Sequence, residues 1–164
     1  MRRYLWGLLI NSVIASRLIP NPLRWRLYRL VGFDVERTRL FEGAWLSPNR
    51  PPIRIGAGTV INRGLTILDA TRVDIGERCF IGPDVLIVTS THHLGGHDHR
   101  AGDLYLESVT IGDGCWIGAR ATFLPGAHVP AGCIIAAGAV VNGTLEPDCI
   151  YGGVPAKLIR RLEA

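Results

Sequence analysis

A large apolar residue recurs at every sixth position between Ile111 and Leu145. It opens each six-residue block, at Ile111, Ile117, Phe123, Val129, Ile135 and Val141, and the fifth position of each block holds Cys, Ala or Leu. This period matches neither the 3.6 residues of a helix nor the alternation of an ordinary strand. It predicts a β-solenoid whose coils have three short flat faces, with every sixth side chain pointing inward. Each coil covers its hydrophobic edge only by stacking on the next, so several coils are required.

The same count can be followed towards the N-terminus. Blocks begin at Ile55, Ile61 and Ile67 and, after a two-residue slip, at Ile75, Ile81 and Ile87. We therefore expect about four coils, beginning near Ile53, within a solenoid domain over residues 46–153. Twenty-four residues separate Ile87 from Ile111, which keeps the sixfold phase. A loop over residues 89–109 is therefore predicted to leave the solenoid.

Residues 1–45 do not follow the repeat. Their basic start, apolar middle and small Ala15-Ser16 pair suit a signal peptide. They also suit an amphipathic helix, because one face collects Leu5, Leu8, Leu9 and Val13. We favour an amphipathic helical segment that packs on the end of the solenoid or lies on a membrane surface through residues 1–31. This predicts a cytoplasmic protein with peripheral contact at the inner membrane surface.

After Leu145 the chain turns, and residues 154–164 are expected to form a short C-terminal helix that begins at Val154-Pro155. The fold class expected is thus mainly β: a solenoid with an N-terminal helical segment, a protruding loop and a short C-terminal helix.

Composition agrees with one ordered domain. The 164 residues are 48% hydrophobic and include 20 Gly and 10 Pro, which suits a fold with many tight corners. The net charge of +4 comes without any Lys/Arg run interleaved with aromatic residues, so no nucleic-acid partner is expected. Cys79, Cys115 and Cys133 fall at the small fifth position of their blocks. They are therefore interpreted as core residues rather than disulfide partners or zinc ligands.

The loop is dense in titratable residues. It holds four of the five histidines, His92, His93, His97 and His99, together with Asp98, Asp103 and Glu107. A long loop on a rigid scaffold is where function most often lies.

Three stretches carry a family resemblance. ILDATRVDIGERCFIGPDVLIVTSTHHLGG, RAGDLY and YGGVPAKLIRRL, with the repeat, resemble the hexapeptide-repeat acyltransferases of the galactoside and maltose O-acetyltransferase branch over about residues 55–162. The resemblance implies a left-handed parallel β-helix, a homotrimer with active sites shared between subunits, and acetyl-CoA as donor, with no metal. It implies transfer of an acetyl group to a hydroxyl of a sugar or glycoconjugate, as in polysaccharide biosynthesis.

The acceptor side of the site follows from the same resemblance. His92 falls where the family has its catalytic base, and Asn62 where it has an amide that binds the acceptor and stabilises the transition state. Asp69 and Asp103 match acceptor contacts. A general base of this kind typically contributes about 10² to 10⁴ in rate. An Asn at a solenoid corner is also common for conformational reasons alone.

The donor side is carried over in the same way. Trp116 matches a wall of the thioester channel, and the other positions implied to contact coenzyme A are Ala119, Ala137, Asn142, Lys157 and Arg160. Asn142-Gly143 stands where the family commonly has Thr-Lys, so one phosphate-binding cation is absent at that point.

Two other classes compete with this interpretation. One is a zinc enzyme of the γ-carbonic-anhydrase type, suggested by the spacing of His92 and His97, although no histidine precedes His92. The other is a non-catalytic solenoid that acts as a scaffold at a membrane, suggested by the basic N-terminal segment.

Overall fold

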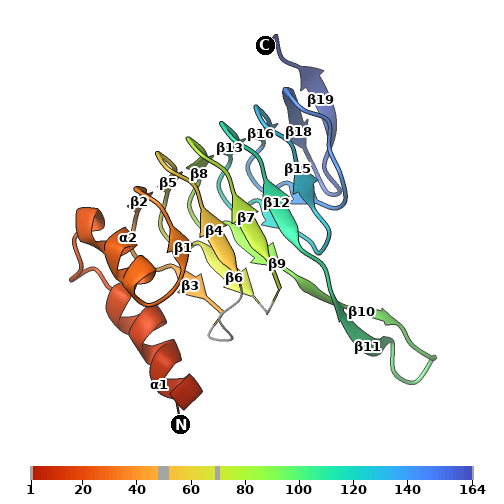
Figure 1. Cartoon of the computed structure of the whole chain (residues 1–164). Helices are drawn as coiled ribbons and strands as arrows, with labels where there is room; N and C mark the ends of the chain where they lie inside the picture. Colours follow the sequence, from red (N-terminus) through yellow and green to blue (C-terminus); the bar gives the residue numbers. More distant parts are fainter. Residues whose placement is uncertain (1, 48–51, 69–70, 164) are drawn as a thin grey trace.

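The computed structural model describes residues 2–47, 52–68 and 71–163. Its N-terminal part is helical: α1 (Arg2–Leu8) continues into the π-helix η1 (Leu9–Ile14), and α2 (Asn21–Leu30) follows. Pro22 lies at the start of α2, where its missing N–H costs nothing. These helices cover one end of a stack of short strands (Figure 1).

The strands of the stack form three sheets along its length, in which all pairings are parallel except that of the last strand. Sheet A contains β1 (Asp34–Val35), β4 (Ile53–Ile55), β7 (Val73–Ile75), β12 (Val109–Ile111) and β15 (His128–Val129). Sheet B contains β2 (Arg39–Leu40), β5 (Val60–Ile61), β8 (Phe80–Ile81), β13 (Trp116–Ile117), β16 (Ile134–Ile135), β18 (Cys149–Gly152) and β19 (Lys157–Arg161). Sheet C contains β3 (Trp45–Leu46), β6 (Thr66–Leu68), β9 (Leu86–Val88), β14 (Thr122–Phe123) and β17 (Val140–Val141).

The predicted period is confirmed in the core. In sheet A, Val35, Ile55, Ile75, Ile111 and Val129 pair in register, and each is at most 2% exposed. Sheets B and C contain equivalent inward columns, so every coil presents the same three apolar side chains to its neighbours. Because the residues between them point outward, two-residue strands suffice to bury a continuous core.

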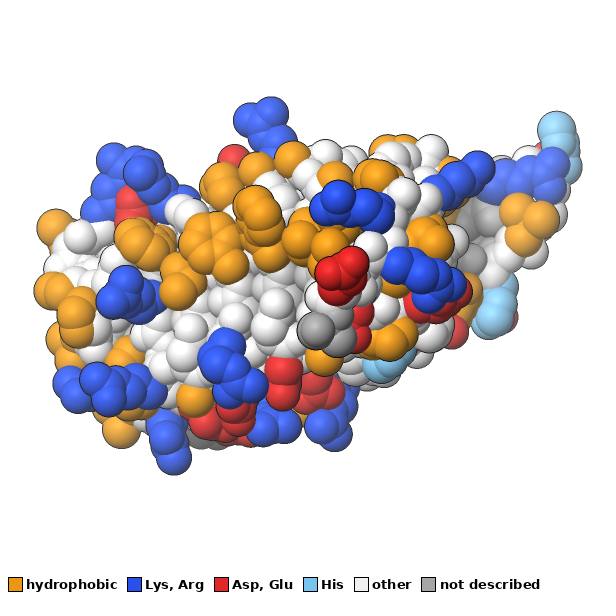
Figure 2. Space-filling model, turned by 90° about the horizontal axis from the view of Figure 1, so that it is seen from above, with side chains coloured by type: hydrophobic (Ala, Val, Ile, Leu, Met, Phe, Trp, Pro, Cys, Tyr) orange, Lys and Arg blue, Asp and Glu red, His pale blue; other side chains and the backbone are white. Residues whose placement is uncertain are grey.

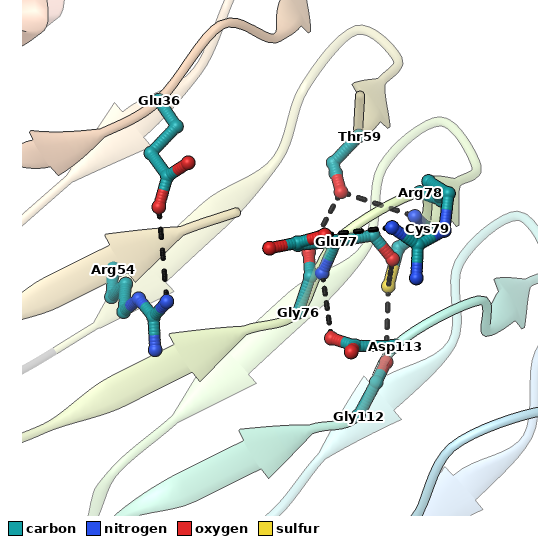
Figure 3. Close-up of polar contacts among 9 residues, drawn as sticks. All are labelled: Glu36, Arg54, Thr59, Gly76, Glu77, Arg78, Cys79, Gly112 and Asp113. Atoms are coloured by element: carbon teal, nitrogen blue, oxygen red, sulfur yellow. Dashed lines mark hydrogen bonds and ion pairs between the residues drawn. The ribbon is translucent and has the colours of Figure 1, made fainter. Parts of the chain in front are cut away.

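A column of Thr and Cys side chains lines the corner between sheets A and B. The Thr59 hydroxyl donates to the Gly76 carbonyl (2.7 Å), and the Cys79 thiol donates to the Gly112 carbonyl (3.1 Å) in the next coil (Figure 3). Cys115 and Cys133 donate in the same way. All four cysteines are buried and free. They act as small core residues that also satisfy corner carbonyls.

Arg24 fastens the helices to the first coil. Its side chain is 1% exposed, and its guanidinium donates to the carbonyl oxygens of Ile14, Ser16, Ile19 and Leu40 and to Asn21 Oδ1. A buried guanidinium is tolerated only when its donors are satisfied, as they are here. Burial lowers the pKa of Arg24 from its usual value.

Two expectations about the ends of the solenoid are wrong. The strands begin at Asp34 rather than near Ile53, because Val35, Leu40 and Leu46 form a first coil whose spacing of five and then six residues hides it in the sequence. Residues 1–45 are therefore helical only as far as Leu30.

The predicted C-terminal helix is also wrong. Lys157–Arg161 forms β19, which pairs antiparallel with β18. An isolated helix of about eight residues is marginal in water, whereas the free edge of β18 offers unpaired backbone groups. The strand therefore replaces the helix and covers that edge.

Candidate active site

The segment predicted as a loop over residues 89–109 forms a β-hairpin. β10 (Ser90–Leu94) pairs antiparallel with β11 (Ala101–Leu106), with a register shift between His92 and Leu94. The hairpin joins β9 of sheet C to β12 of sheet A, and it projects from that corner well beyond the stack (Figure 1). Its outer part therefore has few contacts with the chain that carries it.

His92 lies on this hairpin with an exposed ring. Its Nδ1 is 2.7 Å from the carbonyl oxygen of Gly102 on β11. A carbonyl can only accept a hydrogen bond, so Nδ1 carries the proton. In the neutral ring Nε2 is then left with a free lone pair. The hairpin thus fixes the tautomer that a general base at Nε2 requires.

Asp103 does not share a face of the hairpin with His92. His92 pairs with Leu104, and successive side chains of a strand point to opposite faces. Asp103 is therefore on the face of Tyr105, whose ring stacks on His93 with centroids 4.3 Å apart. Within one chain, the predicted acceptor contact and the predicted base are separated by the hairpin backbone.

Trp116 lies on the outer face of sheet B. Its side chain is 56% exposed, and in register it lies between Phe80, which is 43% exposed, and Ile134. The stripe extends to Val60 on one side and Ile150 on the other. Figure 2 shows hydrophobic side chains in a band along the molecule, with Lys and Arg side chains distributed on both sides of it. A face of this kind provides a rigid apolar surface.

Asn62, Ala119 and Ala137 lie in the turns between sheets B and C. Asn62 Oδ1 accepts a hydrogen bond from the Arg63 N–H (3.2 Å). This bond does not use the side-chain NH₂ group of Asn62. Ala119 and Ala137 follow Gly118 and Ala136 in successive coils. A Cβ on Gly118 would come within 2.4 Å of the Ala137 backbone nitrogen, so the coils pack here backbone to backbone.

The remaining predicted donor contacts lie towards the C-terminal end. Lys157 and Arg160 are exposed on β19, and neither makes an ion pair with any residue in the described ranges. Asn142 follows β17 and is exposed at the corner between sheets C and A. Asp69 lies outside the described residues.

The predicted residues fall into two groups within one chain. Asn62, Trp116, Ala119 and Ala137 lie on sheet B or at its corner with sheet C, whereas His92 leaves from the corner between sheets C and A. Sheet C separates these two corners. A single chain therefore does not bring the base and the donor wall together.

The described residues contain no group of three or more His, Cys, Asp or Glu side chains placed to hold a metal ion. Within residues 2–47, 52–68 and 71–163 no helix is both long enough and apolar enough to cross a bilayer.

Sequence reasoning missed a cavity of about 1120 Å³ between α2 and the first two coils. Arg37 and Arg39 lie at its wall with Trp25 from α2. The Arg-x-Arg pair was visible in the sequence, but the first coil that carries it was not.

Comparisons with known proteins agree with this geometry. The family model for the bacterial transferase hexapeptide (six repeats) matches residues 108–143. This segment of the chain therefore matches the hexapeptide-repeat family. Galactoside O-acetyltransferase of Escherichia coli (strain K12) is 31% identical over 126 residues, which cover 74% of this chain and 62% of that protein. The chain thus spans about three fifths of the length of this relative.

Two solved structures in this hexapeptide-repeat fold extend the likeness to the whole chain. The hexapeptide-repeat acetyltransferase of Vibrio cholerae, complexed with acetyl coenzyme A, has 27% identity and a TM-score of 0.78, covering 99% of this chain and 86% of that one. A galactoside acetyltransferase in complex with coenzyme A has 26% identity and a TM-score of 0.79, covering 99% of this chain and 80% of that one. The resemblance to the galactoside and maltose O-acetyltransferase branch is confirmed.

Proposed function

We propose that this protein transfers an acetyl group from acetyl-CoA to a hydroxyl of a sugar or glycoconjugate, with His92 as general base. The observation that carries the proposal is the hydrogen bond from His92 Nδ1 to the Gly102 carbonyl (2.7 Å), which leaves Nε2 able to accept a proton. The relatives named above, two of them solved with acetyl coenzyme A or coenzyme A, support the donor.

The proposed reaction is a direct transfer from the thioester to the acceptor hydroxyl. The thioester supplies an activated acetyl group. His92 Nε2 accepts the hydroxyl proton as the acceptor oxygen bonds to the acetyl carbon and the carbon–sulfur bond breaks, and the proton then passes to the departing thiolate. No covalent enzyme step is involved, so holding both substrates together supplies much of the rate.

Asn62 is proposed to stabilise charge on the reacting oxygen. Its Oδ1 already accepts from the Arg63 N–H, which orients the amide and leaves its NH₂ group as the available donor. A fixed donor of this kind can contribute about 3 kcal/mol to transition-state stabilisation. Asp69 and Asp103 are proposed as acceptor contacts.

The donor is proposed to lie along sheet B. The exposed Trp116 ring offers an apolar wall, and the small side chains of Ala119 and Ala137 leave room for the pantetheine arm. Asn142, at the corner between sheets C and A, is proposed to contact coenzyme A bound along sheet B of a neighbouring subunit. Lys157 and Arg160 on β19 have no ion-pair partner among the described residues, so their charged groups can bind the phosphate groups of coenzyme A. The residues present therefore fit coenzyme A.

A homotrimer is the proposed assembly. The base on one corner and the donor wall on another face are brought together if the hairpin of one subunit reaches sheet B of its neighbour. The exposed Leu94, Leu104 and Leu106 on the hairpin, between 44% and 85% exposed, suit burial in such a contact.

Peripheral membrane contact through residues 1–31 is proposed as well. Tyr4, Leu5, Val13 and Leu18 are each more than half exposed on the helical segment. Residues 1–31 contain six Arg and neither Asp nor Glu. Exposed apolar groups with cations favour an anionic lipid surface. Sedimentation with anionic and with neutral vesicles tests this: binding to neither would remove the proposal.

The test of the function is transfer itself. Release of the coenzyme A thiol is measured with acetyl-CoA and a panel of galactosides, maltose and glycoconjugates. At least one acceptor is expected to raise thiol release well above hydrolysis in buffer. Coenzyme A binding without transfer to any hydroxyl acceptor, or no binding, would favour the scaffold alternative.

A further inference from the structure

A groove of about 1120 Å³ lies between α2 and the first two coils, on the outside of sheet B. Trp25 and Arg26 line it from α2, Arg37, Arg39 and Phe41 from the first coil, and Val60 from the second. None of the residues that line it is acidic. No role in the transfer reaction has been given to any of them.

The groove concentrates positive charge. The side chains of Arg26, Arg37 and Arg39 are exposed, and none makes an ion pair with a residue that the structure describes. The Arg26 guanidinium lies 5.2 Å from the centroid of the Trp25 ring. Guanidinium groups match the geometry of phosphate oxygens and bind them through paired hydrogen bonds.

Of the three acids nearest to Arg37 and Arg39 in the sequence, Glu36 and Glu42 pair with other arginines, and Asp34 does not line the groove. Glu36 forms an ion pair with Arg54 (Figure 3), with 3.7 Å between the Glu36 carboxylate and the Arg54 guanidinium. Glu42 lies 3.8 Å from Arg17 and 3.5 Å from Arg63. The arginines of the groove are therefore left without the carboxylates that flank them in the chain, and their charge is available to an external anion.

The rest of the groove is apolar, with one unsatisfied hydroxyl at its wall. Trp25, Phe41 and Val60 are all half-buried. Thr38, 5% exposed, has no hydrogen-bond partner for Oγ1 among the described residues, whereas the equivalent Thr59 hydroxyl in the next coil donates to a carbonyl. Buried hydroxyls are normally paired. The groove thus combines an apolar wall with polar groups that lack partners.

The groove is continuous with the stripe that leads to Trp116. Arg39, Val60, Phe80 and Trp116 pair in register across four neighbouring strands of sheet B. Three strand spacings of about 4.8 Å separate Arg39 from Trp116, or about 14 Å.

We propose that this groove binds the phosphoryl or diphosphoryl group of a polyisoprenyl phosphate, with the arginines on the phosphate and the apolar wall against the first isoprene units. The lipid is favoured over a soluble phosphate because the groove has an apolar wall, and because residues 1–33, which include the α2 edge of the groove, carry six Arg, no acid and several exposed apolar side chains. That this lipid carries the sugar acceptor rests on the proposed function, whereas the binding does not.

Titration calorimetry without acetyl-CoA tests the binding, with farnesyl diphosphate as the probe below its micelle concentration. Saturable binding is expected, at least tenfold tighter than that of farnesol or inorganic diphosphate. Arg37→Gln and Arg39→Gln should each weaken it about tenfold. Arg29→Gln, on the same helical segment but outside the groove, is the matched control and should change it less than twofold.

Three results would overturn the inference: no saturable binding, equal weakening by Arg29→Gln, or binding of UDP as tight as that of farnesyl diphosphate, which would indicate a nucleotide site. Thermal melting of each variant shows that it is folded. Because acetyl-CoA is absent, failure of the transfer reaction leaves this result unaffected, and the two proposals can fail separately.

Discussion

His92 on β10 and Gly102 on β11 are joined by a hydrogen bond of 2.7 Å between the imidazole Nδ1 and the backbone carbonyl oxygen. The partner is main chain, so the bond depends on the register of the hairpin and not on a second side chain. It orients an exposed ring on an element that projects from the solenoid. The orientation of the proposed base is thus set by the fold of the hairpin itself.

The first prediction concerns the tautomer of His92. Nitrogen-15 NMR of the neutral ring should show a protonated Nδ1 and an unprotonated Nε2, because a carbonyl accepts and does not donate. His99, whose ring has no such bond to any described residue, serves as the reference ring and should show a mixture of the two tautomers. A protonated Nε2 in neutral His92 would contradict the assigned geometry.

Coil spacing provides a second prediction. A Cβ on Gly118 would lie 2.4 Å from the backbone nitrogen of Ala137, which belongs to the next coil and cannot yield. Gly118→Ala should therefore lower the free energy of unfolding by about 2 kcal/mol. Gly96→Ala, at a position with no atom within 4 Å of the added Cβ, is the control for denaturant unfolding. Equal stability of the two variants would contradict the close approach of these coils.

Arg24 should be essential for attaching the helices. Arg24→Leu removes every donor that the guanidinium offers to the carbonyls of η1, the following turn and β2. Buried acceptors left without partners predict a loss of about 3 kcal/mol in the free energy of unfolding. Arg29→Leu, on the exposed side of α2, should cost little. A mild effect of Arg24→Leu would mean that its hydrogen bonds are replaced by water.

Stability should fall in alkali because of the buried thiols. Burial raises the pKa of the Cys133 thiol above its usual value, and the thiol donates to the Glu146 carbonyl (3.2 Å). The buried thiol contributes its full stabilisation below the pKa of an unfolded-state thiol, about 8.5. As pH rises from there towards the higher folded-state pKa, the free energy of unfolding falls by up to about 1.4 kcal/mol per pH unit. Cys133→Ala should therefore show a shallower fall in melting temperature between pH 8 and 10. The same slope in both proteins would contradict the shift.

The solenoid could be predicted because its core repeats. Ile111, Ile117 and Phe123 open blocks of fixed length, and each occupies the same inward position in the structure. The first coil could not be found in this way, because Val35 and Leu40 are five residues apart and interrupt the count. The corner cysteines were placed correctly because their block position already matched that of Ala.

The ends and the insertion depended on pairing partners that the sequence does not reveal. The segment KLIRR satisfies a helical pattern, but the free edge of β18 pairs with it as a strand. The hairpin could be located by the gap in the repeat, whereas its register, which separates His92 from Asp103, is set by long-range backbone hydrogen bonds. The arginine groove depends on how α2 packs on the first coil, so no local motif marked it.

The central claim is that the imidazole of His92 acts as the base in acetyl transfer. The most direct test measures kcat with acetyl-CoA and an accepted sugar. It compares His92→Ala with His99→Ala and with the unaltered protein. The account predicts that His92→Ala lowers kcat by at least about 100-fold, with unchanged oligomeric state and coenzyme A binding, while His99→Ala stays within about twofold. Near-normal turnover by His92→Ala would contradict it.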